Sequence, residues 1–127
     1  MQQNHLFEYA VIRIVPKVER EEFLNVGVIL YCGKHNFLQT MYNLDEERLR
    51  AFCSVADSSE LLQNLDAFER ICIGDSNAGP IAKLNLPERF RWLTATRSTI
   101  VQTSKVHPGF CTDPRETLIR LYTQLVL

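Results

Sequence analysis

The sequence of 127 residues lacks the features that would place it in several specialised protein classes. It has no apolar run near the roughly 18 residues that a membrane-spanning helix needs, so we expect no membrane span. Its first residues show no basic segment followed by an apolar stretch, unlike a secretory signal. It has four cysteines and three histidines, with no CxxC pair. These absences predict a cytoplasmic protein with free, buried thiols and neither metal nor cofactor.

The common catalytic motifs are also missing from the chain. The patterns GxSxG, HExxH, GxxxxGK[ST] and GxGxxG do not occur in it. This favours a protein that is not an enzyme, although catalytic groups that only folding brings together would leave no such motif.

Size and composition predict one globular domain over residues 1–127. Apolar residues make up 46% of the chain, and 127 residues is an ordinary domain length. The net charge is −1, but it is unevenly distributed. Residues 1–88 hold 13 acids and 8 bases, whereas residues 89–127 hold 2 acids and 6 bases. No acid occurs between Glu88 and Asp113, so this segment is the natural candidate for an anionic partner.

The sequence predicts three β-strands in the first third of the chain. Residues 7–15 and 26–32 are apolar on both faces, which is typical of strands inside a sheet. Residues 37–42 follow a turn signal and predict a third strand, antiparallel to the second. The polar connection between the first two strands is too long for a tight hairpin, and we expect it to bend away from the sheet.

Helical patterns dominate the rest of the chain. Capping residues and apolar stripes predict four helices, which begin near Asp45, Asp57, Asn85 and Asp113. Residues 74–80 predict a loop, residues 98–104 an edge strand, and the HPGF sequence at 107–110 a turn. The predicted fold is α+β: a four-stranded, mainly antiparallel sheet of order 3-2-1-4, with helices packed on one face.

Two polar positions interrupt the first two predicted strands. Arg13 lies in an apolar strand and needs a partner if it is buried; Glu22 is the natural one, either as a structural pair or as half of a polar site. Asn25 and Gly27 lie at the entry to the second strand. Asn25 would bind a ligand or hold the connection in place, and Gly27 would admit a ligand or make room for a helix side chain.

The segment from Arg89 to Thr99 concentrates positive charge. Arg89, Arg91 and Arg97 are followed by Ser98, and guanidinium and hydroxyl groups suit phosphate and carboxylate ligands. The alternative is a solvated helix face whose arginines pair with local acids. Trp92 alone is a weak signal for nucleic acid, and a pI of about 6.3 argues against a general nucleic-acid binder.

Together these segments resemble a bacterial family of unknown function, domain family 3037. The resemblance rests on FEYAVIRIVP with EREEFLNVGVILY, followed by GPIAKLNLPERFRWLTATRSTIVQTSKVHPGF, and it spans nearly the whole chain. It marks the following motif positions without giving any of them a catalytic role: Arg13, Pro16, Glu22, Asn25, Gly27, Arg89, Arg91, Trp92, Arg97 and Ser98. It also implies a cytoplasmic protein, often encoded beside a HipA-like kinase homologue.

Three functional hypotheses follow. The first is an accessory module that binds a protein partner, such as the kinase-like neighbour, through its basic segment. The second is a domain for a phosphate-bearing ligand or nucleotide, with Arg13, Asn25, Arg91, Arg97 and Ser98 in one polar pocket. The third and weakest is nucleic-acid binding. The second hypothesis requires that the arginine segment and the Asn25 region meet in space.

Overall fold

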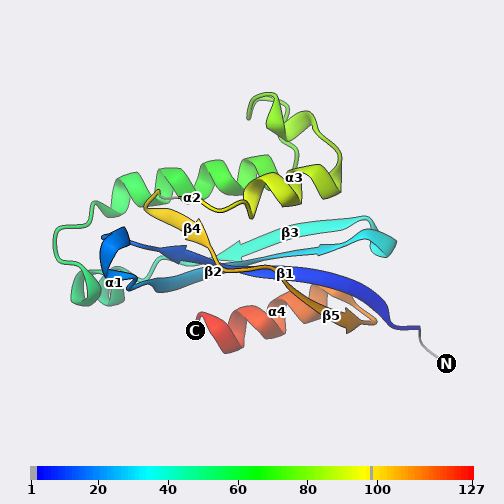
Figure 1. Ribbon diagram of the computed structural model, residues 1–127, viewed down its shortest axis with the longest axis horizontal. Coiled ribbons are helices and arrows are strands. Elements are labelled where there is room, and N and C mark those ends of the chain that lie inside the picture. The colour runs from blue at the N-terminus through cyan, green and yellow to red at the C-terminus, as the bar shows by residue number, and fades with distance from the viewer. Residues whose placement is uncertain (1–2, 98) are drawn as a thin grey trace.

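The structure is a computed structural model that describes residues 3–97 and 99–127. Along the described chain, three strands are followed by three helices, two short strands and a final helix, arranged as drawn in Figure 1. The bounds are β1 (His5–Ile14), β2 (Leu24–Cys32), β3 (Phe37–Tyr42), α1 (Glu46–Phe52), α2 (Ser58–Cys72), α3 (Leu86–Leu93), β4 (Val101–Thr103), β5 (His107–Cys111) and α4 (Pro114–Leu125). Short 3-10 turns occur at Val18–Arg20, Gly33–His35 and Ile81–Lys83.

β1 is the central strand of one antiparallel sheet of order β3-β2-β1-β4. β2 pairs along one edge of β1, while β4 and β5 share the other edge and pair with its end and its start respectively. The predicted fold class and strand order are therefore confirmed. Two details differ: the HPGF segment belongs to β5, which makes the sheet five-stranded instead of four-stranded, and the edge strand predicted over 98–104 covers Val101–Thr103.

Ser104 explains how two short strands share one edge of β1. Its backbone N–H donates to the Val11 carbonyl, and its hydroxyl accepts from the Val11 N–H, both at 2.8 Å. The same hydroxyl donates to the Lys105 carbonyl at 2.9 Å. A side-chain oxygen thus replaces a backbone acceptor at the point where β4 ends, so β1 keeps its hydrogen bonds across the break.

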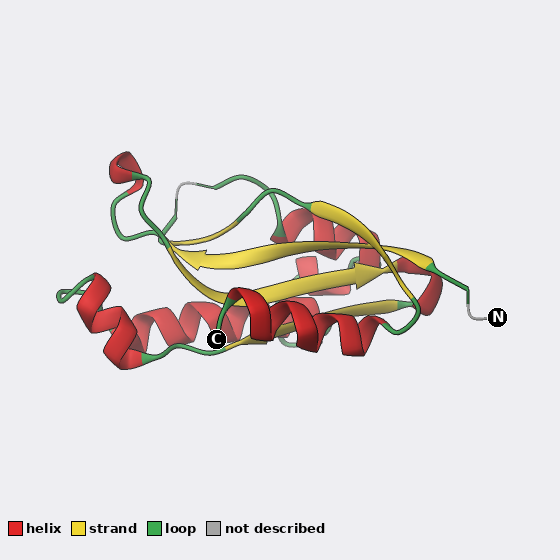
Figure 2. Ribbon diagram, turned by 90° about the horizontal axis from the view of Figure 1, so that it is seen from below, coloured by secondary structure: helices red, strands yellow, loops and turns green. Residues whose placement is uncertain are grey.

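Helices cover both faces of the sheet, not one face as predicted. Figures 1 and 2 show α2 and α3 on one side of the strands and α4 on the other. The alternation of β2 shows why: Ile29 and Tyr31 pack in the core under α2 and α3, whereas Val28 and Leu30 pack in the core under α4. A sheet whose inner strands are apolar on both faces needs both layers to exclude water.

Side-chain caps fix the start of each helix where the sequence places them. Asp45, Asp57 and Asp113 each accept hydrogen bonds from two backbone N–H groups in the first turn of α1, α2 and α4. Asn85 caps α3 by accepting from the Glu88 backbone N–H, and its side-chain amide donates to the Glu88 carboxylate, both at 3.0 Å.

Gly27 lies at a β-bulge, and its missing side chain makes room for the neighbouring strand. Ile12 opposes Gly27 while Arg13 opposes Asn25, so Val26 is the additional residue on β2. A Cβ at Gly27 would lie 2.6 Å from the Met41 carbonyl oxygen and 2.7 Å from the Tyr42 Cβ. The space at Gly27 is therefore occupied by β3, neither by a helix side chain nor by an opening for a ligand.

We expect Gly27→Ala to destabilise the protein by about 1–3 kcal/mol, because β3 has to move away from β2. Urea unfolding followed by circular dichroism measures the change. Gly33→Ala, just beyond the other end of β2, is the matched control, since a Cβ there meets the hydroxyl end of the Tyr31 side chain and no backbone of a neighbouring strand. Equal losses in the two variants would contradict this explanation.

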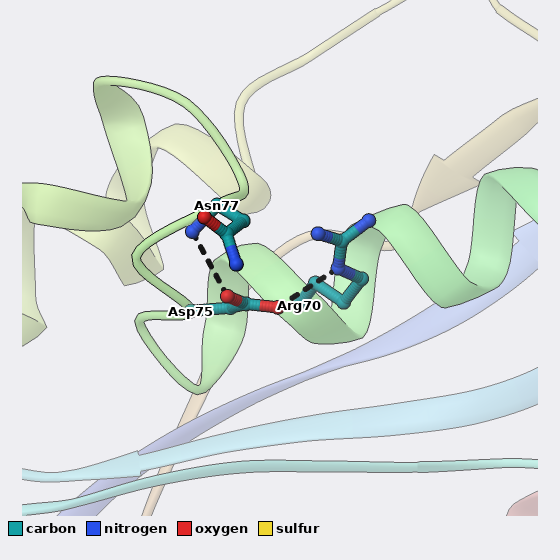
Figure 3. A network of polar contacts seen from close by, with 3 residues as sticks. All are labelled: Arg70, Asp75 and Asn77. Carbon is teal, nitrogen blue, oxygen red and sulfur yellow. Dashed lines mark hydrogen bonds and ion pairs between the residues drawn. The ribbon is translucent and has the colours of Figure 1, made fainter.

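The loop between α2 and α3 is held by one carboxylate (Figure 3). Asp75 accepts from the Arg70 Nε and from the Asn77 backbone N–H, each at 2.9 Å. The Asn77 N–H, and after it the Arg70 guanidinium, holds the pKa of Asp75 below its ordinary value. The carboxylate thus closes the loop that leads from α2 towards α3.

Because the pKa of Asp75 is lowered in the folded state, its contribution to stability is complete above the unfolded pKa, near 4, and is lost as pH falls further. We expect Asp75→Asn to lower the free energy of unfolding at pH 7, with the difference from wild type shrinking below about pH 4. Urea titrations between pH 3 and pH 7 test this. A difference that stays constant over this range would contradict it.

Candidate functional site

The arginine segment forms α3 and the turn that follows it. Phe90 and Leu93 are buried and Leu86 is partly buried against the same core, as the periodicity predicts. Arg91 and Trp92 consequently lie on the outer face, and Trp92 is 40% exposed. α3 therefore presents an aromatic ring and a cation together on the protein surface.

The three arginines of this segment diverge instead of forming one pocket. Arg89 donates from Nη1 to the Leu84 carbonyl at 2.7 Å and lies towards β3. Arg91 is exposed. Arg97 turns back to the end of α3, where it donates to the carbonyls of Leu93 (3.2 Å) and Trp92. Ser98, the fourth predicted member, lies outside the described residues.

Arg97 and Trp92 form one edge of an apolar groove. The Arg97 guanidinium lies 4.2 Å from the centre of the Trp92 ring, within cation–π range. Beside them is a hollow of about 270 Å³ between α2, the end of α3 and β4. We call it the Trp92 groove, and its principal lining residues are Asn64, Phe68, Ile71, Trp92, Arg97, Ile100 and Val101.

The Trp92 groove carries positive charge that no carboxylate of the described chain neutralises. Its lining within residues 3–97 and 99–127 includes Arg97 but no acid, and Arg97 makes no ion pair there. Burial lowers the pKa of Arg97, which shows that the guanidinium is partly desolvated. A partly desolvated cation beside apolar walls suits a ligand that combines an acidic group with an apolar one.

Arg13 and Asn25 lie on the opposite face of the sheet from α3. Ile12 and Ile14 point into the core under α2 and α3, so Arg13 between them points the other way. Asn25 is its cross-strand partner and donates to the Leu125 carbonyl at the end of α4, at 3.2 Å. The structure therefore brings Arg13 and Asn25 together but separates them from Arg89, Arg91 and Arg97.

The expected pair between Arg13 and Glu22 does not form. Glu22 binds the adjacent Arg20 at 2.6 Å on the surface. Glu21 has a left-handed backbone (φ 57°), a conformation rare outside glycine that redirects the chain just before β2. Arg13 instead places its guanidinium 3.8 Å from the centre of the Phe23 ring, a partner that the sequence analysis missed although Phe23 lies in the EFLNVGV motif.

The Arg13 and Asn25 side chains each bury one polar atom without a hydrogen-bond partner in the described chain. These atoms are the Arg13 Nε and the Asn25 Oδ1. Burial also lowers the pKa of Arg13. Nearby, Arg48 donates to the Val126 carbonyl at 2.7 Å, a second side-chain bond to the C-terminal end of α4. Asn25 on β2 and Arg48 on α1 therefore both tie down the C-terminal end of α4.

The described cysteines are free thiols, as predicted. Cys32, Cys72 and Cys111 are buried, while Cys53 is half-buried. Burial raises the pKa of Cys72 to about 11, so this thiol is protonated at neutral pH. In residues 3–97 and 99–127 no three side chains of His, Cys, Asp or Glu form a group that would hold a metal ion.

A family model described as "Protein of unknown function (DUF3037)" matches residues 9–126. The chain belongs to this family. The match confirms the resemblance found in the sequence, and it includes Arg13 on β1 as well as the arginines in and after α3. Comparisons with curated proteins and with solved structures gave no significant match to the DUF3037 chain. No helix among the residues described has the length and apolarity to cross a membrane.

We expect Asn25→Ala to loosen the end of α4 and to lower the free energy of unfolding by about 1 kcal/mol, because the Leu125 carbonyl loses its donor. Amide hydrogen exchange should accelerate in the last turn of α4 and stay unchanged in α3. Asn64→Ala, an exposed asparagine on α2, is the control. Unchanged exchange in α4 of the Asn25 variant would show that Asn25 does not hold the helix.

Proposed function

We propose that this DUF3037 protein is a non-enzymatic interaction module that binds a protein partner through the Trp92 groove. The observation that carries the proposal is the uncompensated Arg97 guanidinium, stacked on a half-exposed tryptophan beside an apolar hollow. Tryptophan and arginine are the residues that most often dominate the binding energy of protein interfaces.

The partner segment that fits this groove has an apolar side chain next to an acid. The apolar side chain enters between Phe68 and Ile100, and the carboxylate reaches Arg97. The kinase-like neighbour implied by the family resemblance is the first candidate partner. A groove of about 270 Å³ is small for a protein interface, so we expect micromolar affinity unless the surrounding surface also contributes.

Recognition of a free phosphate ligand or nucleotide receives less support from the geometry. That hypothesis placed Arg13, Asn25, Arg91 and Arg97 in one pocket, and these residues lie on two faces of the sheet. An interaction groove requires only the residues of α2, α3 and β4, which already lie side by side.

We expect Trp92→Ala and Arg97→Glu each to weaken binding to the co-expressed kinase-like protein by at least about tenfold, with Arg97→Lys losing less of the affinity. Isothermal titration calorimetry on the purified pair measures this. Arg120→Glu is the matched control, because Arg120 is an exposed helix arginine on α4, across the sheet.

Each variant is first shown to keep the wild-type melting temperature. Absence of a complex at micromolar concentration counts against this partner. Binding that survives Trp92→Ala but is lost with Arg120→Glu would place the interface on the other face and overturn the proposal.

A further inference from the structure

The outer edge of β3 is an open strand edge. β3 pairs with β2 on one side and ends the sheet on the other. Its sequence, FLQTMY, contains no charge, proline or glycine, the residues by which proteins commonly protect such edges from pairing. The opposite edge of the sheet is protected, since β4 has 3 residues and β5 contains Pro108.

Three residues of β3 direct their backbone groups outward. The Asn43 N–H donates to the Val26 carbonyl at 2.8 Å, so Asn43 faces β2. Backbone groups alternate in direction along an antiparallel strand. Phe37, Gln39 and Met41 therefore face β2 as well, while Leu38, Thr40 and Tyr42 offer their N–H and C=O groups to a further strand.

A groove runs along the first part of this edge. It has a volume of about 520 Å³ and lies between Asn36–Thr40 and residues of α2 and α3, among them Glu69, Cys72, Ile73, Leu86 and Arg89. Ile73 is 63% exposed beside it. A groove thus opens beside the edge, with polar and apolar walls, while Leu38 and Thr40 themselves retain only 6% and 8% of their exposure.

Charge is ordered along β3 from basic to acidic. Thr40 donates to the Cys72 thiol at 3.1 Å, and Gly74, two residues further along the chain, lies against Arg89. Arg89 is therefore near the start of the strand, and Arg115 binds Gln39 at 2.6 Å on the opposite face. Glu69 lines the same groove and Asp66 lies one helical turn before it on α2; both lie close enough to Tyr42, at the other end of β3, that after burial their carboxylates raise its pKa.

We infer that a second copy of this chain pairs antiparallel along β3 and forms a two-fold dimer with one continuous sheet. A two-fold axis perpendicular to the sheet places the α2–α3 layers of both copies on the same side of the combined sheet. With this axis at Thr40, Thr40 lies opposite Thr40 of the other chain and Leu38 lies opposite its Tyr42. The antiparallel direction brings the basic start of each strand to the acidic end of the other. This self-complementarity selects a second copy over an unrelated extended peptide. The dimer is independent of the Trp92 groove, which lies between α2 and β4.

The first test is the mass of the wild-type protein in solution. Sedimentation equilibrium between about 1 and 200 μM is expected to show twice the chain mass of 14.7 kDa at the higher concentrations. Amide exchange of Leu38, Thr40 and Tyr42 should slow as the dimer forms, with no change in Val101–Thr103. A monomer at 200 μM overturns the inference and leaves the edge to a strand from another protein.

Thr40→Pro and Thr40→Val provide a matched pair of variants. Both remove the hydroxyl bond to Cys72, but only proline removes the outward N–H. We expect the valine variant to remain dimeric and the proline variant to be monomeric with a folded circular dichroism spectrum. A folded proline variant that still dimerises overturns the proposed pairing.

A charge variant keeps the test decisive if Thr40→Pro fails to fold. Asp66 is exposed on α2, so Asp66→Lys is expected to preserve the fold while it weakens the dimer by at least tenfold. Glu116→Lys, an exposed acid on α4, is its control. An unchanged dissociation constant for Asp66→Lys contradicts the proposed charge order.

Discussion

The pairing of β1 with β2 buries side chains on both faces of the sheet, and the rest of the fold depends on this. Ala10, Ile12, Val28 and Leu30 are each essentially inaccessible to solvent. Strands of this kind are stable only with a strand on each side and a helical layer above and below. β3 and the pair β4–β5 supply the strands, and the α2–α3 layer and α4 supply the covers.

Covering both faces also determines where the arginines are placed. Several guanidinium groups contact backbone carbonyls or aromatic rings instead of carboxylates, as Arg48, Arg89 and Arg97 do at helix ends and Arg13 does at Phe23. Carbonyls and aromatic rings carry only partial charge, so these contacts do not neutralise the guanidinium groups. Within residues 3–97 and 99–127, ion pairs occur only for Arg20 and Arg70. The basic segment around α3 thus keeps its positive charge on the surface.

Sequence patterns were sufficient for the parts of the fold that local chemistry determines. Helix caps, the apolar stripe of α2 and the two-sided character of β2 predict the elements and the strand order, because each depends on residues close together in the chain.

The predicted partner of Arg13, Glu22, was wrong because it depended on the left-handed turn at Glu21, for which no glycine or asparagine gives a signal. The hypothesis of one polar pocket that joins Arg13 and Asn25 to the arginines near α3 could not be tested from sequence. The sequence does not show that α3 and α4 pack on opposite faces of the sheet. The same two-sided apolarity that located β2 inside the sheet already required a second helical layer, so the expectation of one covered face conflicted with its own premise.

The two surfaces that remain open are consequences of the same architecture. Two helices over a twisted sheet cannot cover its full width, so a groove remains on each flank of the α2–α3 layer. Towards β4 the groove is lined by the acid-free segment and keeps a single sign of charge. Towards β3 it is lined by Glu69 as well as Arg89, and both signs are present. The positively charged Trp92 groove favours a negatively charged partner. The β3 edge has positive and negative charges in order along it, and is therefore complementary to a second copy of itself. The sheet therefore separates a surface suited to another protein from an edge suited to self-association, and a molecule so built can use both at once.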